Sequence, residues 1–135
     1  TDRQQQIDMA QALYNWQSMI GRLAPLDNLS TLDYDQLIAH YKIQLHFARQ
    51  RCFISDHIIL DKIDKIRHIP TWLIQGRYDL VCPAKQTWEL HQAWPESHLS
   101  FIHLAGHAGD EEGVIDALIS ATDAITYQLP NLIRE

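Results

Sequence analysis

The sequence is poor in the features that would by themselves define a class of protein. Its 135 residues include two cysteines, Cys52 and Cys82, which are too few for a disulfide framework. No run reaches the roughly 18 to 20 apolar residues that span a bilayer, and residues 1–6 lack the apolar core of a signal peptide. We therefore expect no membrane attachment, and a reducing cytoplasm fits the cysteine content.

Positive charge and metal-ligand spacings are scarce as well. The 11 Lys and Arg residues face 17 Asp and Glu, which gives a net charge of −6 and argues against a nucleic-acid partner. His103 and His107 have a four-residue spacing that suits two metal ligands only on a helix, and His103 falls in an expected strand. We expect neither a bound metal nor another cofactor.

Hydrophobic spacing divides the chain into a helical first half and a mixed second half. Apolar residues recur every three or four positions over about 5–23 and 34–51, which predicts two amphipathic helices. A short helix is expected over 58–63, and it ends before Pro70 because a proline disfavours helical geometry in the preceding residue.

Beyond Pro70 the sequence alternates strands and helices. Short apolar segments at 71–75 and 99–104 are each followed closely by a glycine and predict buried strands. Helical patterns lie between them, at 83–94, and after them, at 111–129. This order predicts an α/β unit with two parallel strands and a right-handed crossover.

Two strands are few for such a unit. Parallel strands are normally covered on both faces, in sheets of about five or six strands. We therefore expect this chain to supply only the end of a sheet. The exposed edge and face of that sheet would favour self-association.

The candidate catalytic residues lie in the loops that follow the two expected strands. Ligands gather beyond the carboxyl ends of strands in open α/β sheets, and these loops contain Asp79 and His107. A carboxylate that orients one imidazole nitrogen leaves the other free as a general base. Each residue also has a plain alternative, since an Asp after a glycine is commonly a turn residue and a His near a glycine is commonly structural.

Three segments carry a resemblance to a known family. Residues 76–83 (GRYDLVCP), 88–95 (WELHQAWP) and 105–108 (AGHA) resemble the C-terminal part of proline iminopeptidases, which have the α/β-hydrolase fold. The resemblance implies a partial α/β-hydrolase fold. A helical cap-like segment would occupy 1–69, and the C-terminal end of the core, with the last two parallel strands and their flanking helices, would occupy 70–135.

The resemblance also implies roles for single residues. Asp79 matches the acid of the family's catalytic triad and His107 matches its base. Cys82 matches a cysteine that the family often carries just after its acid.

The nucleophile of that family is absent from these residues. The family carries it on a G-x-S-x-G elbow, and no serine here is flanked by glycines in this pattern: Ser18, Ser30, Ser55, Ser97, Ser100 and Ser120. We therefore expect a C-terminal fragment of a serine aminopeptidase that releases N-terminal proline from peptides, inactive by itself. The alternative is a non-catalytic binding or self-associating module derived from a hydrolase.

Substrate recognition is expected to depart from the family pattern. The family reads the free α-amino group of its substrate with two cap glutamates, and the matching positions are Gln17, which follows Trp16, and Gln44. The resemblance implies substrate-binding roles for these three residues. An amide keeps an acceptor but loses the charge, and charge-assisted hydrogen bonds are roughly twice as strong as neutral ones. Recognition of an ammonium group would therefore weaken; alternatively, both glutamines are solvated helix residues.

Overall fold

The computed structural model describes residues 2–24 and 33–132. The described residues fall into two compact units, one within Thr1–Met19 and Ala24–Ile58 and the other within Ile20–Leu23 and Ile59–Glu135. The short piece Ile20–Leu23 thus belongs to the second unit. The division into segments 1–69 and 70–135 stays a prediction, because compactness alone does not assign a unit to a cap or a core.

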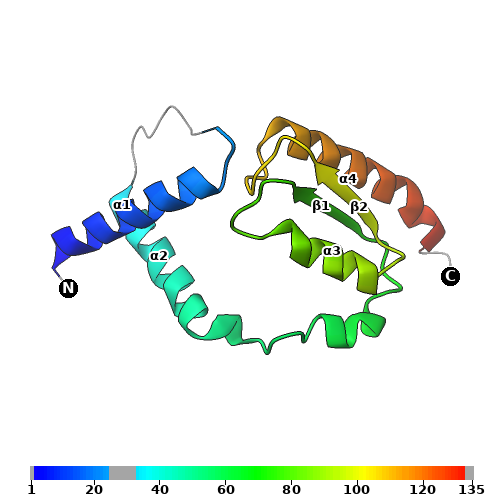
Figure 1. The fold of residues 1–135 in the computed structure, drawn as a ribbon, viewed down its shortest axis with the longest axis horizontal. Coiled ribbons are helices and arrows are strands. Elements are labelled where there is room, and N and C mark those ends of the chain that lie inside the picture. The colour runs from blue at the N-terminus through cyan, green and yellow to red at the C-terminus, as the bar shows by residue number, and fades with distance from the viewer. Residues whose placement is uncertain (1, 25–32, 133–135) are drawn as a thin grey trace. The chain divides into compact units, whose positions relative to one another are not determined.

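Two α-helices dominate the first unit. α1 spans Arg3–Ile20 and α2 spans Tyr34–Arg49, close to the expected helices (Figure 1). Asp33 is the N-cap of α2, and its carboxylate accepts hydrogen bonds from two backbone N–H groups of the first turn. The apolar stripes of the two helices meet in a small core of three buried residues, Ala10, Ile38 and Tyr41.

α2 ends two residues earlier than expected. Arg51, Cys52 and Phe53 have positive φ angles of 50°, 54° and 59°, and they form the short 3-10 helix η1 (Arg51–Phe53). Residues other than glycine adopt this left-handed region at a cost of roughly 1–2 kcal/mol each. The ring of Phe53 packs edge-on against that of Phe47, with 5.3 Å between the ring centroids, and this contact helps to hold the turn.

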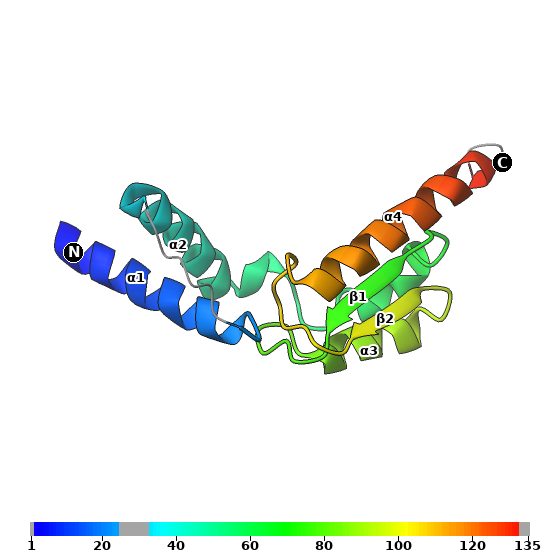
Figure 2. The same cartoon turned by 90° about the horizontal axis from the view of Figure 1, so that it is seen from above.

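The second unit holds two parallel strands and the helices around them. β1 (Trp72–Gly76) and β2 (His98–Ile102) pair in parallel. α3 (Ala84–Ala93) connects them, and α4 (Glu112–Leu132) follows β2. Both views show α3 and α4 on opposite sides of the strands (Figures 1 and 2). The predicted α/β unit with parallel strands is confirmed.

A 3-10 helix stands where a short helix was expected before β1. η2 spans Leu60–Lys65, and Lys62 leaves helical geometry with a φ of −119°. Short segments of this kind commonly adopt the tighter 3-10 form. The buried side chain of Ile63 and the hydrogen bond from the Trp94 indole to the Arg67 carbonyl, at 3.2 Å, tie this region to the end of α3.

β2 begins and ends earlier than the expected strand at 99–104. Arg77 donates its backbone N–H to the Ile102 carbonyl and Tyr78 donates to the Ala105 carbonyl, both at 3.0 Å. These bonds require the chain to turn at residues 103–104. His103 therefore lies in a turn, and its placement in a strand was wrong.

The strands are less buried than expected. Gln75 and Gly76 are buried in β1, but three of the five residues of β2 are exposed. A strand with a neighbour on one side only lacks the cover of a central strand. Among the residues that the structure describes, no helix is long and apolar enough to cross a membrane.

Candidate active site

Asp79 lies in the loop that follows β1, at the carboxyl end of the strand. Its Oδ1 accepts backbone N–H groups from Val81 at 2.9 Å and from Cys82 at 2.7 Å, so the side chain closes a turn in its own loop. Its Oδ2 accepts from the side-chain amide of Gln75 at 3.3 Å. Asp79 therefore fits the plain alternative of a turn residue, and its second oxygen is also turned toward His107; its role as an acid stays a prediction.

Gln75 supports this loop from the end of β1. Its Nε2 lies 3.1 Å from the Cys82 carbonyl and 3.0 Å from the Gly76 carbonyl, and its Oε1 accepts from the Thr87 hydroxyl on α3. Buried amides need such partners, since an unpaired one costs free energy. The sequence analysis does not single out Gln75. An amide at the end of an otherwise apolar strand is the signal that could have identified it.

His107 lies in the loop that follows β2, and its Nδ1 is 2.9 Å from Oδ2 of Asp79. The Asp79 side chain is only 7% exposed, whereas that of His107 is 46% exposed. When Nδ1 carries the proton and donates it to the carboxylate, Nε2 keeps a lone pair that can take up a proton. The arrangement is thus chemically suited to general-base catalysis.

The environment of Asp79 favours its ionised form. Burial by itself would raise the pKa of this carboxyl. Hydrogen bonds from the Cys82 backbone, the His107 side chain and the Val81 backbone outweigh that effect, so the pKa lies below its usual range. Local desolvation raises the pKa of the Cys82 thiol, and the nearby Asp79 charge adds to the rise. The Asp79 carboxylate is therefore charged, and it lies beside a neutral Cys82 thiol.

The two loops touch through their backbones. A Cβ atom on Gly76 would lie 1.9 Å from the Gly106 carbonyl oxygen and 2.8 Å from that of Ala105. No other residue type fits there without moving main chain. Gly76, the last residue of β1, therefore allows the acid loop and the histidine loop to approach closely enough for the Asp79–His107 hydrogen bond.

Asp79, Cys82 and His107 also form a cluster of metal-ligating atoms, which all lie within 4.8 Å of one another. Both oxygens of Asp79 already accept N–H hydrogen bonds. The described geometry is therefore that of a hydrogen-bonded acid–base pair rather than an open cation cage.

The three residues expected to bind substrate lie in the first unit, whereas Asp79 and His107 lie in the second. Gln17 is on α1, and its Oε1 accepts the hydroxyl of buried Tyr41 at 3.0 Å. Trp16 precedes it and is 57% exposed, and Gln44 is exposed on α2. Their roles in substrate binding stay predictions.

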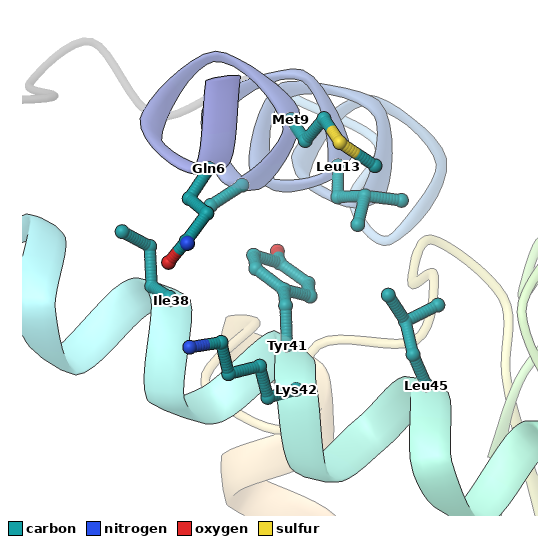
Figure 3. Close-up of a pocket in the computed structure, with 8 residues that line it drawn as sticks. Gln6, Met9, Leu13, Ile38, Tyr41, Lys42 and Leu45 are labelled. Atoms are coloured by element: carbon teal, nitrogen blue, oxygen red, sulfur yellow. The ribbon is translucent and has the colours of Figure 1, made fainter. Parts of the chain in front are cut away.

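A pocket of about 170 Å³ lies between α1 and α2, and the sequence reading did not predict it. Figure 3 shows Met9 and Leu13 of α1 facing Ile38, Tyr41 and Leu45 of α2 across the hollow. These residues follow the ordinary apolar spacing of packed helices, which does not distinguish a pocket wall from a core. The full lining is Gln6, Met9, Ala10, Leu13, Ile38, Tyr41, Lys42 and Leu45.

Curated proteins of one kind are similar to nearly all of the chain. A proline iminopeptidase of Arabidopsis thaliana is 39% identical over 125 residues, which is 90% of this chain and 33% of that protein. A proline iminopeptidase of Neisseria gonorrhoeae is 37% identical over 131 residues, which is 94% of this chain and 39% of that protein. The chain resembles the C-terminal part of proline iminopeptidases.

This similarity covers a limited share of the relatives. A probable proline iminopeptidase of Leptolyngbya boryana, 39% identical over 125 residues, is likewise matched over 90% of this chain and 39% of its own length. The chain thus spans between a third and two-fifths of the curated relatives it matches. No family model matches the chain. The parallel strands, the flanking helices and the similarity to proline iminopeptidases confirm the predicted partial α/β-hydrolase fold.

Proposed function

We propose that this chain forms the C-terminal part of a serine aminopeptidase that releases N-terminal proline from peptides. Asp79 and His107 would be the acid and base of its catalytic triad. The observation that carries the proposal is the 2.9 Å contact between His107 Nδ1 and Asp79 Oδ2, made by loops that leave neighbouring parallel strands. The similarity of this chain to proteins named proline iminopeptidase supports the substrate class.

In this mechanism a serine that lies outside the 135 residues attacks the carbonyl carbon of the substrate's N-terminal proline. Nε2 of His107 takes the serine proton as the new C–O bond forms, and Asp79 stabilises the resulting imidazolium through Nδ1. His107 then gives the proton to the leaving amine as the peptide C–N bond breaks. Water hydrolyses the prolyl ester by the same route, which returns the proton to the serine.

Substitution of His107 tests the role of the base. In the protein at its full natural length, His107→Ala should lower kcat for a prolyl arylamide by about 10⁴-fold or more. His103→Ala is the matched control, because His103 is an exposed histidine in the turn after the same strand. Equal activity of the two variants would contradict the proposal, as would hydrolysis of the arylamide by residues 1–135 alone.

Gln17 and Gln44 shift the preference away from a substrate with a free α-amino group. The Gln17 oxygen already accepts the Tyr41 hydroxyl, so it is a poorer acceptor for an ammonium group than a carboxylate would be. The rates on a free and an N-acetylated prolyl arylamide test this preference. A strong preference of the unmodified protein for the free amine would contradict it, and Gln17→Glu should raise the preference for the free amine.

Exposed apolar side chains favour a second candidate, a binding or self-associating module. Leu104 and Tyr127 are 80% and 84% exposed, and Phe101 on β2 is 38% exposed. For residues 1–135, light scattering coupled to size-exclusion chromatography should then show a mass that rises with concentration. A monomer at all concentrations would argue against this candidate.

A further inference from the structure

We propose that Glu111 is a positioning residue for His107, which it holds by tying the histidine loop to the segment Ile20–Leu23. We call the contacts between this segment and residues 106–111 the latch. This role rests on the proposed function, because it names what holds the proposed base in place.

Glu111 bridges two segments with one carboxylate. Its Oε2 accepts the backbone N–H of Gly106 at 2.6 Å, directly before His107, and its Oε1 accepts the backbone N–H of Leu23 at 3.1 Å. The backbone of Glu111 is itself fixed at the start of α4, since its carbonyl accepts from Val114 and Ile115 at 2.9 and 3.0 Å. A carboxylate suits this bridge because both of its oxygens accept.

The Gly21 carbonyl bonds the backbone of the candidate base directly. It accepts the N–H of His107 and the N–H of Ala108, each at 2.9 Å. Both acceptor positions of one carbonyl are thus used on two consecutive residues of the histidine loop. The main chain that carries the imidazole cannot move away from residue 21 without losing both bonds.

Arg22 adds a charged contact beside Glu111. Its Nη2 donates to both carboxylate oxygens of Asp110, at 2.5 and 2.7 Å, and the arginine side chain is only 19% exposed. The Asp110 side chain is 63% exposed, so solvent and salt weaken this pair, and it adds less to the latch than the bonds of Glu111 and Gly21.

The latch is packed as well as hydrogen-bonded. A Cβ atom on Gly106 would lie 3.0 Å from the Gly21 carbonyl oxygen and 3.3 Å from Cα of Arg22. On the other side of the histidine loop, the Ala105 carbonyl accepts a hydrogen bond from the N–H of Tyr78 in the acid loop. The histidine loop is therefore held between the acid loop and residues 20–23, which fixes the backbone from which the His107 ring reaches Asp79.

The latch also has a place in the chain that suits a role in catalysis. Ile20 is the last residue of α1, the helix that carries Trp16 and Gln17, and residues 21–23 follow it directly. The latch bonds are made by residues 21–23 and 106–111, within the second unit, and none of them involves Trp16, Gln17 or Gln44. Loosening the latch should impair proton transfer more than substrate binding.

The variant Glu111→Gln breaks the bridge, because an amide has one accepting oxygen where the latch needs two. Glu112→Gln is the matched control, since Glu112 is the exposed neighbour in the first turn of α4. In the full 135-residue chain, the amide protons of Gly106 and Leu23 should exchange at least about tenfold faster in Glu111→Gln than in Glu112→Gln. The ¹⁵N shifts of the His107 ring should change from a single tautomer, protonated at Nδ1, toward an average of two.

Kinetics in the protein at its full natural length distinguish positioning from stability alone. Glu111→Gln should lower kcat at least about tenfold with KM close to that of Glu112→Gln. Equal ring shifts, exchange rates and kcat in the two variants would overturn the latch. If Glu111→Gln does not fold, Glu111→Asp replaces it, because the shorter carboxylate cannot reach both N–H groups. It should raise the exchange rates of the Gly106 and Leu23 amides, and rates equal to those of Glu112→Gln would overturn the proposal.

The failure of the latch and the failure of the proposed function give different results. If His107→Ala keeps full activity, the proposed function is wrong, whatever the amide exchange shows. If His107→Ala is inactive but Glu111→Gln behaves like Glu112→Gln, the proposed function stands and the latch is wrong.

Discussion

The two loops that carry the candidate acid and base are held in different ways. The partners of Asp79 within its own loop, together with Gln75, lie no more than four positions from it in sequence. The histidine loop depends on Gly21, Arg22 and Leu23, and the Leu23–Glu111 bond joins residues 88 positions apart. A local turn positions the acid, whereas a long-range contact positions the base. Local and long-range supports should respond differently to substitution, and the following predictions are ordered by the size of the expected effect.

Asp79→Asn removes the candidate acid and should have the largest effect on kcat. The amide cannot accept the Nδ1 proton with the strength of a carboxylate, so the tautomer with a free Nε2 loses its support. We expect kcat on a prolyl arylamide, in the protein at its full natural length, to fall by about 10⁴-fold. Asp123→Asn, an exposed aspartate on α4, serves as control, and a similar kcat in both variants would contradict the role of Asp79.

Gly76→Ala disrupts the backbone contact between the acid loop and the histidine loop. The new methyl group would lie 1.9 Å from the Gly106 carbonyl oxygen, so main chain has to move. We expect the free energy of unfolding to fall by about 3 kcal/mol or more. Gly109→Ala is the matched control, because a Cβ there meets nothing within 4 Å. Denaturant titration of both variants measures the difference, and equal midpoints would show that the two loops do not pack as described.

Gln75→Leu tests the support of the acid loop from β1. The substitution leaves the Cys82 carbonyl and the Thr87 hydroxyl without their partner, which should lower the free energy of unfolding by about 1–3 kcal/mol. Gln92→Leu, at an exposed position of α3, should have little effect. If Gln75→Leu is as stable as Gln92→Leu, the acid loop is held without Gln75.

The smallest expected effect is a pH dependence of stability due to Asp79. The pKa of this carboxyl is lower in the folded state than its unfolded value of about 3.9. The corresponding stabilisation is fully present above that unfolded value and is lost as the pH falls through the lower, folded one. The free energy of unfolding of the unmodified chain should therefore decline toward that of Asp79→Asn below about pH 4. A constant difference across this range would contradict a lowered pKa.

The sequence predicts the helices, the strands and the meeting of the two loops that follow the strands. Apolar periodicity identified the helices and strands, and the position of Asp79 and His107 just beyond two strand ends paired them correctly. Gln75 was missed because the apolar pattern around it identifies a strand but does not show that a polar residue within the strand has hydrogen-bond partners. Glu111 and Gly21 were missed because their partners lie far away in sequence, where no local pattern records them.

The errors have the same origin. β2 ends at Ile102 because its loop has to reach the backbone of the acid loop, a requirement that the apolar run through Leu104 does not reveal. α2 ends at Arg49 before three residues with positive φ, and none of these is a glycine that would have signalled the turn.

The latch sets a condition for moving the candidate acid and base into another protein. The acid loop could be grafted onto a different parallel sheet as one continuous segment from Gln75 to Thr87, because this segment contains the partners of the Asp79 side chain other than His107. The neighbouring strand and loop would have to supply carbonyls for the N–H groups of Arg77 and Tyr78. The histidine loop could not be grafted in this way, since a graft of residues 103–111 would leave the N–H groups of His107 and Ala108 without their shared acceptor. A transplant of the base would have to include a second, separate piece that supplies the main chain of residues 20–23.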